Sequence, residues 1–210
     1  MRLRIVFAKQ GPLRYVGHLD LQKIWERTIR RAGLPLAYTQ GFHPQPRLQI
    51  ASALPLGFTS RAEIVDIFLT HPIELASLKE RLQAASPSGL EILEIKEVEM
   101  NEPALQSQLR AAEYTITLPQ PAPLADQELG RRVAALLQAT SLPRQRRGKE
   151  YDLRPLIEDL RLLEGGCLFM RLSAREGATG RPEEVLDALG IPWEEAQIER
   201  IRLIFAGETS

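Results

Sequence analysis

The stretch that decides the fold is residues 11–57, GPLRYVGHLDLQKIWERTIRRAGLPLAYTQGFHPQPRLQIASALPLG. It places two of the three histidines, a basic amphipathic segment and a loop with several prolines in less than a quarter of the chain. A hydrophobic core needs none of these features, whereas clustered cations and rigid loops are typical of binding surfaces. We therefore expect the protein to bind its ligand or partner here.

The middle of this stretch predicts an amphipathic helix over residues 21–32. Its apolar residues recur with the 3.6-residue period of a helix that is buried on one side, and Gly33 is placed to end it. Positively charged residues on the other side fall at i, i+4, i+7 and i+8, so they form one stripe: Lys23, Arg27, Arg30 and Arg31. Such a stripe is either a solvated face or an anion-binding face, and both interpretations stay open.

Residues 38–47 predict a structured loop. Gly41 permits unusual dihedral angles, while Pro44 and Pro46 fix their own φ and push the preceding residues toward extended conformations. Rigidity of this kind suits a binding element.

Outward from this stretch, the first half of the chain predicts the order β-α-β-β-α-β. Strict alternation over residues 2–9 is typical of a half-buried strand. Further strands are expected at residues 48–54, 63–69 and 90–98, and a second helix at residues 72–85. These elements predict one domain over residues 1–98, which carries the HLDL and GFHP motifs.

The second half repeats that order. Residues 99–112 lack a clear period and are predicted to be a linker. Residues 113–210 then form a second domain, with strands at 113–118, 151–162, 167–173 and 198–205 and helices at 126–139 and 182–189. The predicted fold class is α+β, with two tandem ferredoxin-like units whose sheets are antiparallel.

Composition limits the class of protein. A chain of 210 residues with 44% hydrophobic residues can bury a core in each of two domains. No run approaches the roughly 20 apolar residues that span a bilayer. The N-terminal MRLRIVFAK is too short and too charged for a signal peptide. We therefore expect a cytoplasmic protein that does not bind membranes.

The net charge of zero conceals two basic islands. Residues 1–60, the first island, hold nine Lys or Arg against two acidic residues, and residues 143–155, the second, hold five against two. Clustering of this kind favours binding to a polyanion such as RNA, or to an acidic protein surface. The candidate RNA-binding residues are Arg2, Arg4, Arg14, Lys23, Arg27, Arg30, Arg31, Arg47, Arg144, Arg146, Arg147, Lys149 and Arg154.

Five short blocks carry a family resemblance. They are residues 11–14 (GPLR), 18–21 (HLDL), 31–35 (RAGLP), 40–44 (QGFHP) and 54–57 (LPLG), and a weaker likeness continues through residues 152–155 (DLRP). In this set the chain resembles the radical-SAM-linked family, a domain of unknown function encoded beside, or fused behind, a radical SAM protein. The motif residues are His18, Asp20, Gln40, Gly41, Phe42, His43 and Pro44.

The resemblance implies a radical SAM protein as the partner. Because the chain has only Cys167, it lacks the three cysteines of a radical SAM cluster site, and that chemistry must belong to the partner.

His18 and His43, with Tyr15 beside them, are the candidate catalytic residues. Imidazole titrates near neutral pH, and both histidines lie in the first island, so they could serve a metal-independent ribonuclease. The alternative is that His18 packs the helix and His43 braces its loop. His18, Asp20 and His43 do not have the spacing of a zinc signature, so we expect no metal. No Gly-rich phosphate loop follows a predicted strand, so we expect no cofactor.

Three hypotheses follow from these observations. The first is a non-catalytic accessory module that binds RNA, of the tRNA or rRNA class, and presents it to a radical SAM partner. The second is an endoribonuclease that uses His18 or His43. The third is a protein–protein adaptor for a radical SAM enzyme, without nucleic acid.

Overall fold

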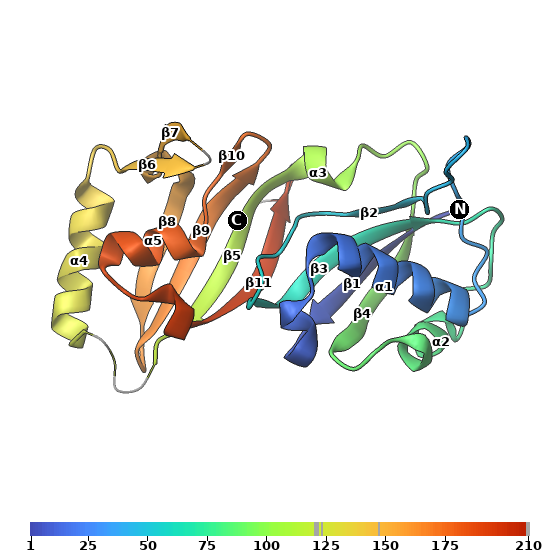
Figure 1. The fold of residues 1–210 in the computed structure, drawn as a ribbon, viewed down its shortest axis with the longest axis horizontal. Coiled ribbons are helices and arrows are strands. Elements are labelled where there is room, and N and C mark those ends of the chain that lie inside the picture. Colours follow the sequence, from blue (N-terminus) through green and yellow to red (C-terminus); the bar gives the residue numbers. More distant parts are fainter. Residues whose placement is uncertain (120–121, 123, 147, 209–210) are drawn as a thin grey trace. The chain divides into compact units, whose positions relative to one another are not determined.

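The structure, a computed structural model, describes residues 1–119, 122, 124–146 and 148–208. The chain divides into two compact units, Met1–Gln108 (unit 1) and Leu109–Ser210 (unit 2). Each unit is a mixed α+β structure with few helices and antiparallel strand pairing (Figure 1). The α+β class and the antiparallel sheets predicted from the sequence are confirmed.

Unit 1 carries four main strands and two main helices. In chain order its elements are β1 (Arg2–Lys9), the 3-10 helix η1 (Gly11–Tyr15), α1 (His18–Arg31), β2 (Leu48–Ile50), β3 (Thr59–Phe68), α2 (Leu78–Ala85), β4 (Leu90–Val98) and α3 (Leu105–Gln108). The strands lie in the order β4–β1–β3–β2, and each neighbouring pair is antiparallel. The register sets Arg4 of β1 opposite Asp66 of β3.

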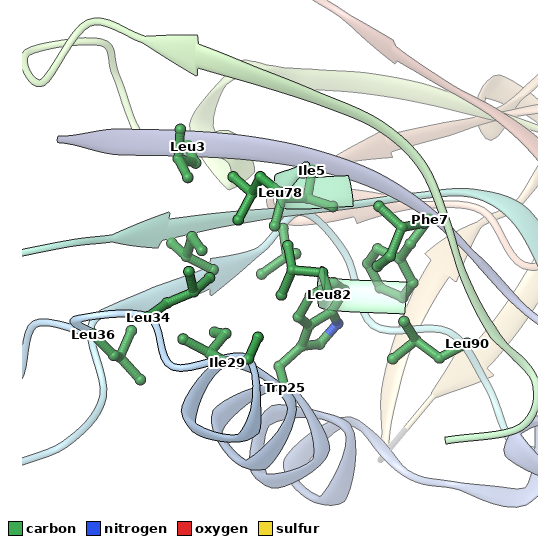
Figure 2. Packing of buried hydrophobic residues seen from close by; sticks show 14 of the residues in the cluster. Leu3, Ile5, Phe7, Trp25, Ile29, Leu34, Leu36, Leu78, Leu82 and Leu90 are labelled. Carbon is green, nitrogen blue, oxygen red and sulfur yellow. The ribbon is translucent and has the colours of Figure 1, made fainter. Parts of the chain in front are cut away.

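The core of unit 1 lies between the sheet and its helices. The side chains of Leu3, Ile5 and Phe7 project from one face of β1. They pack in one cluster with Trp25 of α1 and other apolar side chains (Figure 2). The rings of Phe7 and Trp25 pack edge to face, with centroids 4.9 Å apart. Because side chains alternate along a strand, Arg2 and Arg4 point to the opposite face of the sheet.

Unit 2 repeats this plan with additions. Its elements are β5 (Leu109–Thr117), α4 (Asp126–Gln138), β6 (Pro143–Arg146), β7 (Lys149–Asp152), the 3-10 helix η2 (Arg154–Leu156), β8 (Ile157–Leu163), β9 (Cys167–Arg175), β10 (Ala178–Thr179), α5 (Pro182–Leu189), the 3-10 helix η3 (Trp193–Glu195) and β11 (Gln197–Phe205). The strands lie in the order β11–β5–β9–β8, while β10 also pairs with β9, and β6 and β7 form a separate hairpin.

Several boundaries differ from those predicted. The strand expected at 151–162 is two strands, because Pro155 lacks an amide donor and sits in η2 between β7 and β8. The expected linker 99–112 contributes α3 and the first residues of β5. α1 begins at His18, three residues early, since Gly17 serves as its N-cap and accepts the Leu21 amide at 2.9 Å.

The second predicted helix also differs, because α2 starts at Leu78 and not at residue 72. None of the helices in the described part of the chain combines the length and the apolar composition that a membrane span requires.

Candidate nucleic-acid interface

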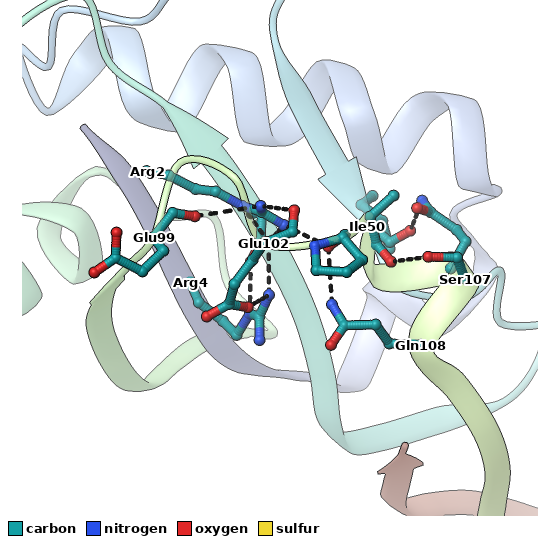
Figure 3. Close-up of polar contacts among 11 residues, drawn as sticks. Arg2, Arg4, Ile50, Glu99, Glu102, Ser107 and Gln108 are labelled. Carbon is teal, nitrogen blue, oxygen red and sulfur yellow. Dashed lines mark hydrogen bonds and ion pairs between the residues drawn. The ribbon is translucent and has the colours of Figure 1, made fainter. Parts of the chain in front are cut away.

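The arginines of β1 are committed to the fold. The Arg2 guanidinium donates to Asp66 Oδ2 at 2.6 Å and to the carbonyls of Glu102 and Pro103 at 2.6 and 3.1 Å. Figure 3 shows Arg2 beside Glu102. Its side chain is 2% exposed, and that of Asp66 is fully buried. Arg2 is therefore buried and engaged by its own chain, unlike the exposed arginines of α1.

Arg4 belongs to the same network. Its Nε and Nη2 donate to the two oxygens of Asp66 at 2.9 and 3.0 Å, and Nη2 also lies 3.0 Å from Glu102 Oε2. The hydrogen bond to Asp66 is the main reason that the pKa of Arg4 is raised. Both cations thus fasten residues 99–103 to the sheet, so the contacts of Arg4, like those of Arg2, are made within the fold.

The outer face of α1 is different. Lys23 pairs with Asp20 at 3.1 Å on the surface, but Arg27, Arg30 and Arg31 form no ion pair or side-chain hydrogen bond with any residue that the structure describes. These three exposed side chains, the α1 arginine cluster, line a shallow cavity of about 320 Å³. Unpaired guanidinium groups around a hollow can donate hydrogen bonds to the oxygens of a phosphate.

The end of α1 that carries this cluster is held in place. Gly33 adopts φ +67°, the left-handed conformation that ends a helix, and Arg81 of α2 donates to the Ala32 carbonyl at 2.8 Å. Cations in a last helical turn also interact favourably with the helix dipole. The cluster is therefore presented on a fixed scaffold.

The 38–47 loop leaves this end of unit 1 and returns to β2. Its stem is a short antiparallel bridge between Tyr38 and Pro46, flanked by a bond from the Thr39 amide to the Gln45 carbonyl at 2.8 Å. The motif residues Gln40, Gly41, Phe42, His43 and Pro44 form the tip, and all five are exposed. The prediction of a structured loop is confirmed by these bonds.

Tyr38 joins the loop to α1. Its hydroxyl donates to Glu26 Oε1 at 2.9 Å. Burial and this bond raise the pKa of Tyr38, while the nearby Arg30 guanidinium acts in the opposite direction. One acidic residue, one aromatic ring and the arginine cluster therefore share one surface of unit 1.

Two other cations of the first island stack on aromatic rings of their own chain. The Arg14 guanidinium lies 4.7 Å from the centroid of Tyr15 and donates to its hydroxyl. The Arg47 guanidinium lies 4.6 Å from the centroid of Phe68. Arg47 is nevertheless exposed, so it keeps donors for a ligand.

The structure does not assemble a catalytic pair of histidines. His18 is the first residue of α1, whereas His43 belongs to the loop that follows the last turn of this helix (Figure 1). A helix of 14 residues is about 20 Å long, so the two histidines are far apart. His18 faces Gln22 at 3.3 Å, one turn further along α1, and Tyr15 contacts Arg14. Within the described ranges, no group of three His, Cys, Asp or Glu residues could hold a metal ion.

The second island is largely committed within unit 2. Arg146 donates to Glu184 at 3.0 Å and to the Tyr151 hydroxyl at 3.1 Å. Burial and the Glu184 carboxylate raise the pKa of Tyr151 to about 12. Arg154 donates to the carbonyls of Leu137 and Ile157, so it closes the end of α4.

The remaining cations of this island have weaker ties. Arg144 donates to its neighbour Pro143, and exposed Lys149 lines, together with Arg146 and Tyr151, a cavity of about 670 Å³. Arg147 lies outside the described residues.

Comparison with known families adds a classification. A family described as "Uncharacterized protein conserved in bacteria (DUF2344)" matches residues 2–182. The chain belongs to this family. The DUF2344 match covers almost all of unit 1 and extends to the first residue of α5 in unit 2. No curated protein matches the chain.

Two features of this DUF2344 member were not predicted from its sequence. Tyr38 was not among the candidate residues, although an aromatic residue at the edge of a Gly- and Pro-containing loop is a signal of an exposed contact.

Asp66 was also missed. A carboxylate in the apolar run EIVDIFL requires a charged partner when it is buried, which points to a neighbouring cation.

Proposed function

We propose that this protein is a non-catalytic accessory module that binds RNA, of the tRNA or rRNA class, and presents it to a radical SAM partner protein. The observation that carries the RNA-binding proposal is the α1 arginine cluster, whose three guanidinium groups have no carboxylate partner among the described residues. The radical SAM partner rests on the resemblance of motifs such as HLDL and GFHP.

We also propose that each unit has a ferredoxin-like fold. The order β1-α1-β2-β3-α2-β4 of unit 1 supports this, and so does β5-α4-β8-β9-α5-β11 of unit 2. On this interpretation β6, β7, η2 and β10 are additions to the second unit.

Electrostatic arguments favour RNA over a neutral ligand. Each arginine that neutralises a phosphate releases a counterion, so the affinity must fall as salt rises. Three such contacts to a single strand contribute about −2 to the slope of log affinity against log salt. Tyr38 and Arg47, at the two ends of the 38–47 loop, are also exposed. They add an aromatic ring and a further cation to the surface available to a nucleic acid.

The test is a binding titration with tRNA between 50 and 200 mM salt. We expect Arg27→Gln/Arg30→Gln/Arg31→Gln to weaken binding at least about tenfold at low salt and to reduce the slope by about 2. The matched control is Arg131→Gln/Arg161→Gln/Arg175→Gln, which removes the same charge from exposed arginines of unit 2. The control should bind like the unmodified protein.

Two results would contradict the proposal. One is the absence of salt-sensitive RNA binding in the unmodified protein. The other is an equal loss in both triple variants, which would mean that only net charge matters.

A protein–protein adaptor without nucleic acid is the second candidate, and one observation favours it. Tyr15, Leu19 and Leu56 are 64%, 70% and 59% exposed. The Gly57 amide donates to the Arg14 carbonyl at 2.8 Å, so the turn that carries Leu56 lies against η1. Exposed apolar side chains of this size are typical of protein interfaces. Co-purification of a radical SAM protein after ribonuclease treatment, without any RNA affinity, would select the adaptor.

A further inference from the structure

Phe42 is the most exposed large apolar residue in the described part of the chain. Its relative exposure is 102%, so the ring touches almost nothing in its own molecule. A phenylalanine in this position forgoes the free energy that burial of its ring would provide. A single exposed apolar residue needs no explanation by itself, but this ring sits at the tip of an organised loop.

The loop that carries Phe42 is held by four bonds. The amides of Thr39 and Arg47 donate to the carbonyls of Gln45 and Ala37 at 2.8 Å, and the Gln45 amide donates to Thr39 Oγ1 at 2.9 Å. The fourth is the bond from the Tyr38 hydroxyl to Glu26. Gly41 adopts φ +127°, which few other residues tolerate. A loop whose stem is held in advance loses less backbone entropy on binding than a free segment.

The loop starts beside the α1 arginine cluster. Tyr38 contacts Glu26 of α1 and lies in the field of Arg30. Phe42 is four residues further along, so it lies within about 14 Å of Tyr38. Single-strand binding sites of roughly 4–16 nucleotides are common, and a bound strand of that length covers both the cluster and the ring. The connection that bears the loop projects between α1 and β2 in Figure 1.

We infer that Phe42 is a stacking platform for an unpaired nucleobase of the RNA whose phosphates the α1 arginine cluster holds. This inference rests on the proposed function and specifies its substrate class as single-stranded RNA, or a loop or tail of a folded one. Bases in an RNA duplex are stacked on each other and offer no free face, whereas an unpaired base can lie on an aromatic ring. Charge complementarity favours a nucleotide over an apolar protein side chain, because exposed cations border the loop's stem.

The experiment compares two probes of one sequence, an unstructured oligoribonucleotide of about 12 nucleotides and the same strand in a duplex. We expect Phe42→Ala to weaken binding of the single strand roughly 5- to 100-fold without changing the salt slope. Phe42→Trp should retain the affinity, because a larger ring also stacks. Leu163→Ala, which removes an exposed apolar side chain of β8 in unit 2, is the matched control and should have no effect.

Failure of this inference is distinguishable from failure of the proposed function. If the single strand binds in a salt-sensitive way but Phe42→Ala is without effect, or if the duplex binds as tightly, stacking is overturned and RNA binding stands. If Phe42→Ala reduces co-purification of a partner protein and leaves RNA affinity unchanged, the ring is a protein contact and the inference is wrong. If neither probe shows salt-sensitive binding, the proposed function fails as well. Since the ring is exposed, the variants should keep the melting temperature of the unmodified protein.

Discussion

The arginines of β1 and the arginines of α1 are equally prominent in the sequence, yet they have opposite uses in the structure. Arg2 and Arg4 meet the buried carboxylate of Asp66 and hold residues 99–103 against the sheet. Arg27, Arg30 and Arg31 meet no carboxylate in the described ranges. Whether an arginine binds a ligand or stabilises the fold therefore depends on the acidic residues that folding brings beside it.

Unit 2 shows the same rule within one short segment. Arg146 donates to Glu184 and Arg154 to the Leu137 carbonyl at the end of α4. Among the described residues, Arg144 donates only to the carbonyl of its neighbour Pro143. A basic island in a sequence thus mixes structural and available cations. Substitutions on each side of this distinction should therefore differ in their effects on stability.

Asp66→Ala should destabilise the protein most. It leaves Arg2 buried without its partner, and loss of one member of a buried pair costs about 3–5 kcal/mol. Urea denaturation measures the change. Asp159→Ala, which breaks the surface pair with Arg161, is the control and should cost at most about 1 kcal/mol. A cost below about 1 kcal/mol for Asp66→Ala would mean that the β1 network is not structural.

Arg146→Gln should lower stability by an intermediate amount, about 1.5–3 kcal/mol, since it removes charged hydrogen bonds to a half-buried carboxylate. The same denaturation experiment applies, with Arg144→Gln on the same strand as the control, expected within about 0.5 kcal/mol of the unmodified protein. RNA affinity should not change in either variant. A large loss of affinity in Arg146→Gln with unchanged stability would place this arginine among the ligand-binding cations.

The triple variant Arg27→Gln/Arg30→Gln/Arg31→Gln should have the smallest effect on stability, within about 1 kcal/mol. Removal of the repulsion between Arg27 and Arg31, one turn apart, is worth a few tenths of a kcal/mol. Loss of cations beside the helix terminus costs a similar amount. A fall in melting temperature that matches the Asp66→Ala variant would show that the cluster is structural after all.

Local patterns in the sequence predicted much of the secondary structure. The alternation of residues 2–9 and the helical period that begins at Leu21 gave β1 and most of α1, because each pattern is set by residues only two to four positions apart. Pro155 shows the limit of that reasoning. Residues 151–162 are predicted to form one strand, but the missing amide of Pro155 divides this segment into β7, η2 and β8.

The candidate site was less predictable, because its decisive contacts join distant residues. The pairing of Arg2 with Asp66 spans 64 positions and depends on the register of β1 against β3. Phe42 shows the reverse difficulty. A phenylalanine is usually buried, so the residue type alone predicts a core position. Phe42 is instead exposed, at the tip of a loop shaped by hydrogen bonds that the sequence does not reveal.

The bond from Arg81 to the Ala32 carbonyl has a wider consequence. It means that the position of the α1 arginine cluster, the surface proposed to bind RNA, is set in part by a side chain from a different helix, which itself lies outside the cluster. On the proposed function, substitutions in α2 should then alter RNA affinity from a distance, by letting the terminal turn of α1 shift. A mutational survey restricted to the contact surface would overlook this control point.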